Sequence, residues 1–431
     1  MSRFAGIKNN RICIISDYPI NNKDLQVIEV PESFAEISSK DLIINSKIKD
    51  GQIHYKLKNK PVKDIKLALV GNWKMRCGIS TYAENLWPEI VKHVGNYKLF
   101  IEENIGESTG LLNDMGGEII DDDKISVCWK RGESLQKLID EINEYDPDIV
   151  YISHEFGLWS SASKWLSLMS QLSEYRVIVT MHSIFRHKDK TICEAAMPEI
   201  ISHLQGGYDV LKYEKGIPGK VHVIPHGCTP CNDKSKLWNF YKSNHTFITQ
   251  GFGFSYKQLD QSIRAVSLLK EKYSDIFFTC LFSESDYNKV GHQIYYNELM
   301  DLIKELDVQE NVALIRGYQS DETINSYLRT NRVSVFPYGS HPDHECWGAS
   351  GAARLAMSKA IPVISSSIHH FSDLPTIKAD SPEEIAEALD RLFSDQKEID
   401  KQVEKQIEFL NENSWENIGK RHVKLFEGNL L

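Results

Sequence analysis

The sequence has no long apolar run. No segment of its 431 residues reaches the ~18 consecutive apolar residues that a membrane-spanning helix needs. The first residues, MSRFAGIKNNR, hold no apolar stretch of the kind found in signal peptides. We therefore expect a cytoplasmic protein.

An excess of positive charge is also absent, because the formal net charge is −10. This net charge excludes a protein that is basic overall, as many nucleic-acid-binding proteins are. It does not exclude a local basic cleft. The segment FRHKDK (185–190) allows peripheral contact with an anionic membrane or an acceptor phosphate. A solvated loop is the alternative interpretation of that segment.

A second pair of zinc ligands is missing as well. Cys228 and Cys231 form the only CxxC motif, and no other pair of ligands follows at a zinc-site spacing. Most of the eight cysteines lie in apolar strings such as RICIIS and FFTCLF. Those strings are typical of reduced core cysteines.

The sequence does contain short apolar runs that alternate with amphipathic helix patterns, such as TYAENLWPEIVKHV and LDQSIRAVSLLKEKY. This alternation predicts parallel sheets with helices on both faces, an α/β fold. We predict buried strands at nine places: 65–71, 148–153, 176–182, 221–227, 246–252, 276–282, 311–318, 333–338 and 361–366.

The alternation weakens around residues 228–245, which we interpret as an interdomain linker. The chain length favours two domains. We predict doubly wound domains at 66–228 and 245–411, and a last amphipathic helix within 412–431. Residues 1–65 carry strand patterns but no site motif, and we interpret them as an N-terminal extension packed on the first domain.

Candidate site residues of the first domain follow its predicted strands, because ligands of open α/β sheets bind beyond the carboxyl ends of the strands. Gly78 permits close backbone approach at a helix start, and Arg76 can pair with a phosphate there. His154 and Glu155 suit contact with a sugar or acceptor, and His182 can donate to a hydroxyl or phosphate. The alternatives are an ordinary turn, a capping carboxylate and histidines at the core edge.

Two further candidates lie in the second domain. Lys257 stands just before a helix in TQGFGFSYKQLD and can contact a diphosphate, although a solvated lysine is the alternative. The stretch HECWGASGAARLAM starts with Glu345 and continues as a helix that begins with small residues. Such a helix start exposes backbone N–H groups, which attract anions.

Together these motifs resemble the retaining GT-B glycosyltransferases of family 4. The resemblance rests on the order of WKMRCGISTYAENL, ISHEFGLW, VTMHSIF, VIPHG, GFSYKQLD, GYQSDETINSYL, SVFPY, HECWGASGAARLAM and IPVIS, and it covers about residues 66–431. It implies two Rossmann-like domains that face a cleft, with the donor held mainly by the second domain and the acceptor by the first. It also implies a UDP- or GDP-sugar donor, no metal and no other cofactor.

The resemblance also assigns roles to individual residues. Gly78 matches a glycine loop that faces the donor phosphates, and His182 matches a histidine near the transferred sugar. Lys257 matches the diphosphate-binding lysine, and Glu345 matches a glutamate that contacts sugar hydroxyls. The backbone amides expected to meet the diphosphate are those of Gly348, Ala349, Ser350 and Gly351.

The sequence departs from the family pattern at two places. The arginine that usually precedes the lysine is absent from GFGFSY, and Arg76 is our candidate for its replacement. A second glutamate usually follows the first, but here the position holds Ala353 or, in another alignment, Leu355. We expect this loss to change how the nucleotide is held more than how the bond is broken.

We therefore predict sugar transfer from a nucleotide diphosphate to an acceptor hydroxyl with retention, on a glycan, a lipid-linked or another carbohydrate acceptor. One alternative is a glycosyltransferase that acts on modified viral DNA, so nucleic acid stays open as a partner without being favoured. A second is a non-catalytic module that binds a sugar nucleotide. A third is a phosphorylase or epimerase on the same fold.

Overall fold

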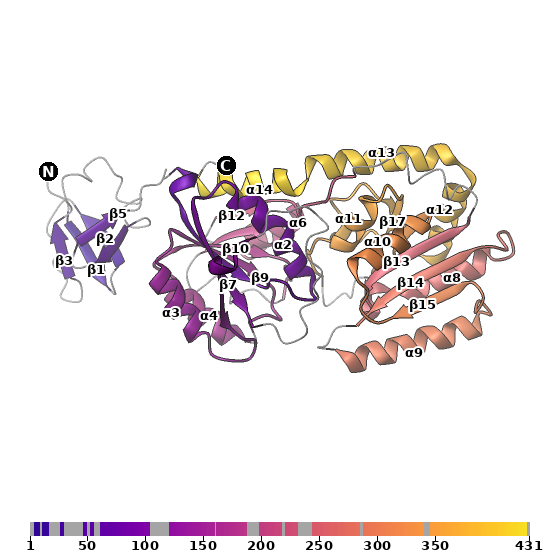
Figure 1. Ribbon diagram of the computed structural model, residues 1–431, viewed down its shortest axis with the longest axis horizontal. Coiled ribbons are helices and arrows are strands. Elements are labelled where there is room, and N and C mark those ends of the chain that lie inside the picture. Colours follow the sequence, from indigo (N-terminus) through magenta and orange to yellow (C-terminus); the bar gives the residue numbers. More distant parts are fainter. Residues whose placement is uncertain are drawn as a thin grey trace.

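The structure is a computed structural model. It describes residues 61–103, 120–159, 161–187, 198–217, 220–231, 244–284, 288–339 and 345–428, together with the backbone of five short strands nearer the N-terminus. Figure 1 shows two α/β halves side by side, each built around its own parallel sheet.

The first sheet has seven parallel strands in the order β12-β11-β10-β9-β6-β7-β8. Its strands are β6 (Lys66–Gly71), β7 (Asn96–Glu102), β8 (Ile125–Trp129), β9 (Ile149–His154), β10 (Arg176–Met181), β11 (Glu199–Ser202) and β12 (Val221–Val223).

The second sheet has six parallel strands in the order β15-β14-β13-β16-β17-β18. They are β13 (Thr246–Phe252), β14 (Phe277–Ser283), β15 (Val312–Arg316), β16 (Val333–Phe336), β17 (Val363–Ser365) and β18 (Ile377–Lys378).

Helices cover both faces of each sheet, as the alternation of apolar runs and helix patterns predicts. Around the first sheet lie α2 (Gly78–Val91), α3 (Gln136–Tyr145), α4 (Ala162–Gln171), α6 (Gln205–Asp209) and α14 (Trp415–Phe426). Around the second lie α8 (Leu259–Leu269), α9 (Lys289–Glu305), α10 (Asp321–Thr330), α11 (Gly351–Met357), α12 (Pro382–Ser394) and α13 (Gln396–Glu412). None of the described helices is both long and apolar enough to cross a membrane.

Side-chain alternation along each strand divides the core of each domain into two layers. On β6, Leu67 and Leu69 pack with α2 and α14, whereas Ala68 and Val70 pack with α3 and α4. In the second domain, Phe247 of β13 lies in the layer under α8 and α12, and the next residue, Ile248, lies in the layer with α11. Both faces of these central strands are therefore buried, which is why their sequences are continuous apolar runs.

All nine strands predicted from the sequence are present, although their bounds differ by a few residues. The strands β7, β8, β11 and β18 were not predicted from the sequence. β8 and β18 are edge strands, β11 has four residues and β18 two, and β7 begins with three residues that are not buried. Strands of this kind lack the long apolar run on which the prediction depended.

The N-terminal part forms two small antiparallel sheets. One pairs β1 (Phe4–Lys8) with β2 (Arg11–Ser16) and β3 (Gln26–Glu29), and the other pairs β4 (Ser46–Lys49) with β5 (Gln52–Tyr55). β2 and β4 lie against each other, so the two sheets form one β unit. Figure 1 shows this unit at the end of the molecule beside the first domain.

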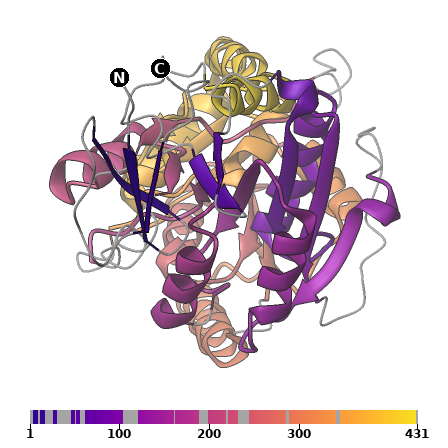
Figure 2. The ribbon, with the colours of Figure 1, turned by 90° about the vertical axis from the view of Figure 1, so that its left-hand side faces the viewer.

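The chain passes between the domains twice, at Cys228 and at Asn413–Trp415. The two crossings are joined, because Cys228 N donates to Asn413 O over 2.8 Å and Trp415 N donates to Cys228 O over 3.1 Å. Figures 1 and 2 show α13 and α14 running along one side of the molecule, and α14 packs against α2 of the first domain. Most of the predicted linker, residues 232–243, lies outside the described residues.

A charged cluster ties the end of α14 to the first sheet. Arg176 donates to the carbonyl groups of Leu425 and Phe426, and it also pairs with Glu199 over 2.7 Å. Burial alone would raise the pKa of Glu199, but hydrogen bonds from His222 and Arg176 outweigh burial and lower this pKa to about 2. Glu199 therefore belongs to the contact that holds the last helix in place.

We predict that this cluster makes the protein sensitive to acid. Because the pKa of Glu199 falls from 4.5 to about 2 on folding, its stabilisation is present above pH 4.5 and is lost as the pH falls toward 2. The shift corresponds to at most about 3 kcal/mol. Urea unfolding at pH 7 and pH 3.5 should show a smaller pH difference for Glu199→Gln than for the wild type. An unchanged difference would contradict the role of Glu199.

Candidate functional site

The topology of both sheets points to one region. The order of the first sheet reverses at β6, which lies between β7 and β9, and the order of the second reverses at β13, between β14 and β16. Ligands of doubly wound sheets bind beyond the carboxyl ends of the strands at such a reversal. The segments that follow β6 and β13 hold Arg76 and Lys257, so the expected site includes both.

Lys257 is an almost fully buried cation. It closes a short helical turn after β13 (η5, Ser255–Lys257), and only 7% of it is exposed. A methyl group on Gly251 would lie 2.7 Å from its ammonium nitrogen, and the ring of Tyr338 lies 5.0 Å from that nitrogen. Among the described residues its ammonium has no carboxylate or hydrogen-bonding partner. Burial lowers the pKa of Lys257 to about 8.

Gly348 and His370 lie on the same side of the second domain as Lys257. A methyl group on Gly348 would lie 3.5 Å from Nε2 of His370, in the turn η7 (His369–Phe371). The His370 ring lies 6.4 Å from that of Tyr338. Burial and the neighbouring Lys257 lower the pKa of His370 to about 4. The turn therefore places a neutral imidazole beside the buried ammonium.

Gly348 also touches the first domain. A methyl group there would lie 2.9 Å from the carbonyl oxygen of His182, so no larger residue fits without a shift. His182 follows β10, and its Nε2 is buried without a hydrogen-bond partner among the described residues. Burial and His154 lower its pKa to about 3, which leaves the ring neutral. The structure therefore brings together His182, Gly348, His370 and Lys257.

His182 belongs to a group of three histidines around Tyr82, of which His203 is buried and the other two are partly buried. His182, His203 and His226 lie 4.7, 5.2 and 5.1 Å from the Tyr82 ring. The ring of His226 reaches toward α11, because a methyl group on Gly351 would lie 3.9 Å from its Nε2. His226 packs between Tyr82 and Trp415, which indicates a structural role.

Glu345 is held by an ion pair between the domains. Its carboxylate bonds to Arg186 of the first domain, which also pairs with Glu214, and it lies 3.6 Å from Nε2 of His369. The contact with sugar hydroxyls stays a prediction, and here the carboxylate faces a guanidinium. The predicted segment FRHKDK is described only as far as His187, and its Arg186 is already paired.

The helix start at α11 is partly capped. The hydroxyl of Ser350 accepts from the N–H of Ala353 over 3.3 Å. Ala353, one position for the expected second glutamate, is fully buried in the core, and Leu355 is half-buried. Between them Arg354 pairs with Asp373 and donates to Ser350 O over 3.0 Å. A buried cation thus lies next to both candidate positions of the missing carboxylate.

Arg76 and Gly78 lie at the start of α2. The guanidinium of Arg76 stacks 4.9 Å from the ring of Tyr318, which follows β15 of the second domain. No heavy atom lies within 4 Å of a methyl group placed on Gly78, so the backbone there is open. No described contact links Arg76 with Lys257. Its predicted replacement of the missing arginine stays untested.

His154 and Glu155 follow β9. His154 is buried between Phe156 and Trp165, and burial lowers its pKa to about 3. Glu155 accepts from the hydroxyl of Ser183 over 2.6 Å and from the N–H of Phe156 over 2.9 Å. Both residues therefore support the loop that carries His182, and their contact with an acceptor stays a prediction.

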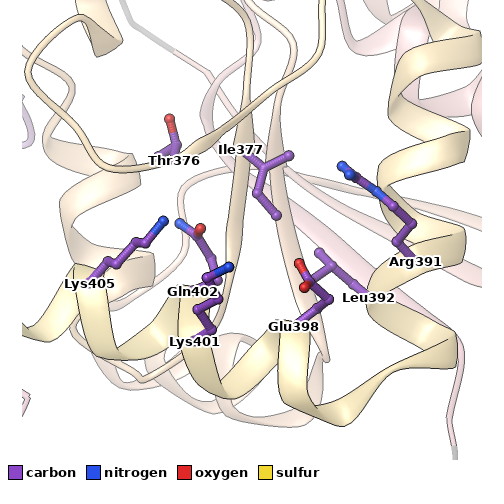
Figure 3. A pocket seen from close by; sticks show the side chains of 8 residues that line it. All are labelled: Thr376, Ile377, Arg391, Leu392, Glu398, Lys401, Gln402 and Lys405. Atoms are coloured by element: carbon purple, nitrogen blue, oxygen red, sulfur yellow. The ribbon is translucent and has the colours of Figure 1, made fainter.

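The described residues contain no group of three or more histidine, cysteine or acidic side chains arranged to bind a metal. A separate hollow of about 270 Å³ lies between α12, α13 and β18, and Arg391, Glu398, Lys401 and Lys405 are among the residues that line it (Figure 3). These four side chains are exposed. The hollow contains none of the predicted site residues.

No protein-family model and no curated protein sequence matches the chain. Its structure is similar to that of Anabaena Alr3699/HepE in complex with UDP, with a TM-score of 0.63, 12% identity and coverage of 84% of this chain and 100% of that one. A glycosyltransferase from Rickettsia africae is also similar, with a TM-score of 0.63, 14% identity and coverage of 85% of this chain and 99% of that one. A trehalose-6-phosphate synthase structure has a TM-score of 0.64 and 12% identity, covering 84% and 99%.

The chain has the GT-B fold. In this GT-B chain the segments after β6 and β13 belong to different domains. The contacts between the two domains include those of Arg76 with Tyr318 and of Gly348 with His182. His370, Arg354 and Tyr338 were not predicted as site residues from the sequence. One signal was available for His370, because HHF follows the predicted strand 361–366 just as Lys257 follows strand 246–252.

Proposed function

We propose that the protein is a glycosyltransferase that moves a sugar from a nucleotide diphosphate to an acceptor hydroxyl, with retention of configuration. The observation that carries the proposal is Lys257. Among the described residues the Lys257 ammonium has no anionic partner. A buried unpaired charge is unfavourable, and a bound diphosphate would supply a negative charge beside it. The GT-B fold and the UDP complex of the similar HepE structure support a nucleotide-sugar donor.

In the proposed reaction, negative charge develops on the leaving diphosphate. Lys257 and the backbone amides of residues 348–351 stabilise that charge, and fixed groups of this kind act without reorganisation. His182 and Glu345 position the sugar. The resemblance implies retention and a reaction without metal, and the described side chains suggest no covalent nucleophile. We therefore propose attack of the acceptor on the same face from which the diphosphate leaves.

A thermal-shift panel of UDP-, GDP- and other nucleotide sugars tests this proposal. A matching donor should raise the melting temperature with a dependence on its concentration, because ligands that bind only the folded state stabilise it. Release of the nucleoside diphosphate that depends on an added acceptor would then separate transfer from a phosphorylase or epimerase reaction. Binding without any turnover would instead favour a non-catalytic module.

We predict that the affinity for the nucleoside diphosphate falls as the pH rises through about 8. Only the protonated Lys257 attracts the ligand, and its pKa in the free protein is about 8. Above that value the dissociation constant should rise by up to about tenfold per pH unit, until the pKa of the complex is reached. Isothermal titration of UDP and GDP between pH 6.5 and 9.5 measures this. Lys257→Met should abolish the slope, and an equal slope in that variant would exclude Lys257 as its origin.

The chemical class of the acceptor is a separate proposal. Carbohydrate, lipid-linked and modified-DNA acceptors all present a hydroxyl, and the proposed chemistry at the donor is the same for each. Binding of a DNA acceptor should weaken steeply with salt, because phosphate contacts release counterions. A weak salt dependence of acceptor binding would favour a neutral carbohydrate.

A further inference from the structure

Trp347 belongs to the second domain by sequence and to the first domain by packing. It lies in the segment after β16 that leads into α11, yet its indole is part of the first-domain core that includes Ile184 and Leu204. Only 4% of Trp347 is exposed. Separation of the domains would therefore transfer a large apolar side chain from a packed core into water, which is unfavourable.

Two glycines of α6 make the socket for this indole. A methyl group on Gly206 would lie 2.5 Å from the indole nitrogen of Trp347. A methyl group on Gly207 would lie 3.2 Å from its Cβ. Glycine is unfavourable inside a helix, so its presence at Gly206 has a packing explanation, which is access for the indole.

The rest of the indole is enclosed from both domains. The ring of His369 stacks on Trp347 with 4.5 Å between the centroids. The Arg186 guanidinium lies 5.0 Å from the Trp347 ring and bonds to Glu345. The indole thus lies between the turn that carries His370 and the arginine that holds Glu345.

The backbone around Trp347 is bonded to the first domain as well. Trp347 N donates to Ile184 O over 2.9 Å, and Ile184 N donates to Trp347 O over 3.3 Å. Phe185 and Cys346 form an antiparallel bridge beside this pair. The next residue is Gly348, where an added methyl group would lie 2.9 Å from the carbonyl oxygen of His182.

We propose that Trp347 is a positioning residue that couples domain closure to assembly of the donor site. It inserts into the Gly206–Gly207 socket and holds residues 345–348 against the loop of His182. This inference rests on the proposed function, in which the backbone at Gly348 faces the diphosphate. That backbone reaches its position beside His182 only when the indole occupies the socket. In the separated domains, Lys257 stays in the second domain but the His182–Gly348 contact is lost.

Gly206→Ala tests this from a residue that touches no part of the proposed donor site. Alanine is the better helix former, so local propensity favours the variant, but its methyl group displaces the indole. Suppose that the fraction of molecules in which the indole occupies the Gly206–Gly207 socket falls from nearly all to about a tenth. The dissociation constant for UDP or GDP then rises about tenfold. Small-angle scattering without nucleotide should show a larger radius of gyration for Gly206→Ala and for Trp347→Ala.

The double variant Gly206→Ala/Trp347→Ala separates this coupling from general damage. Without the indole the added methyl has nothing to displace, so Gly206→Ala should weaken nucleotide binding only in the wild-type background. Trp347→Phe, which keeps an apolar ring in the socket, should restore much of the affinity lost in Trp347→Ala. Trp87→Phe is the control, because Trp87 is fully buried in the first domain and stacks on Trp73. It should lower the melting temperature and leave the radius of gyration unchanged.

The inference is overturned if Trp347→Ala keeps the wild-type radius of gyration, or if Gly206→Ala weakens nucleotide binding equally in both backgrounds. Failure of the proposed function looks different. If the wild type binds no nucleotide while Trp347→Ala and Gly206→Ala still expand the molecule, the role of Trp347 in domain closure stands. Only its link to a nucleotide site is then wrong.

Discussion

Replacing Lys257 with methionine should strongly weaken nucleotide binding and stabilise the unliganded protein at the same time. Loss of a buried cation that pairs with the ligand typically costs about 2–5 kcal/mol of binding energy, which is roughly 30-fold or more in affinity. The gain in stability has a separate origin. Burial depresses the pKa of Lys257 from 10.5 to about 8, so the charged lysine destabilises the folded state below pH 8.

The size of that stability gain follows from the same shift. It corresponds to at most about 3 kcal/mol at pH 7, and the destabilisation disappears as the pH rises past 10.5. Urea unfolding at pH 7 without ligand measures the gain, and isothermal titration with UDP and GDP measures the loss of binding. The matched control is Lys401→Met, because Lys401 is an exposed lysine on α13, outside the proposed donor site. If Lys257→Met matched the control in both measurements, Lys257 would not be the anion-binding residue.

Removal of the Asp373 carboxylate should have the largest effect on stability. Arg354 is only 2% exposed, and Asp373 is the carboxylate with which it pairs. The Nε of Arg354 has no hydrogen-bond partner among the described residues. Asp373→Ala leaves the guanidinium buried without its counterion, which typically costs about 3–5 kcal/mol. The free energy of unfolding from urea titration is the measurement.

The double variant Arg354→Met/Asp373→Leu is the informative comparison for this ion pair. Replacement of both partners by apolar side chains of similar size is often close to neutral, because no charge is left uncompensated. We expect the double variant to be much more stable than Asp373→Ala. An equal loss in both variants would mean that the packing volume, and not the ion pair, stabilises this part of α11.

The ends of the buried parallel strands could be predicted from the sequence, and with them much of the candidate site. Apolar runs show where a strand stops, and parallel strands place their carboxyl ends at one edge of the sheet. Lys257 and His182 were found in this way. His370 was not, although it follows a correctly predicted strand, because two adjacent histidines match no motif with a known mechanism.

Contacts between the domains could not be predicted, since they depend on how two separately folded sheets meet. Arg186 and Glu345 are ion-paired although 159 positions separate them in the sequence. Sequence patterns gave no sign of this pair: the contact of Glu345 with sugar hydroxyls stays a prediction, and Arg186 was expected only in a solvated or ligand-binding loop. Trp347 gave no signal either, because an apolar residue before a helix indicates only burial, and the sequence does not tell in which domain it is buried.

We propose that Lys257 and the facing loops hold a nucleoside diphosphate sugar for transfer. The most direct measurement is nuclear magnetic resonance of the protein incubated with the donor selected by thermal shift and candidate acceptors. The wild type should release the nucleoside diphosphate and form a glycoside with the anomeric configuration of the donor, while Lys257→Met should form neither product. Absence of both binding and turnover for all UDP- and GDP-sugars, or undiminished turnover in Lys257→Met, would contradict this account.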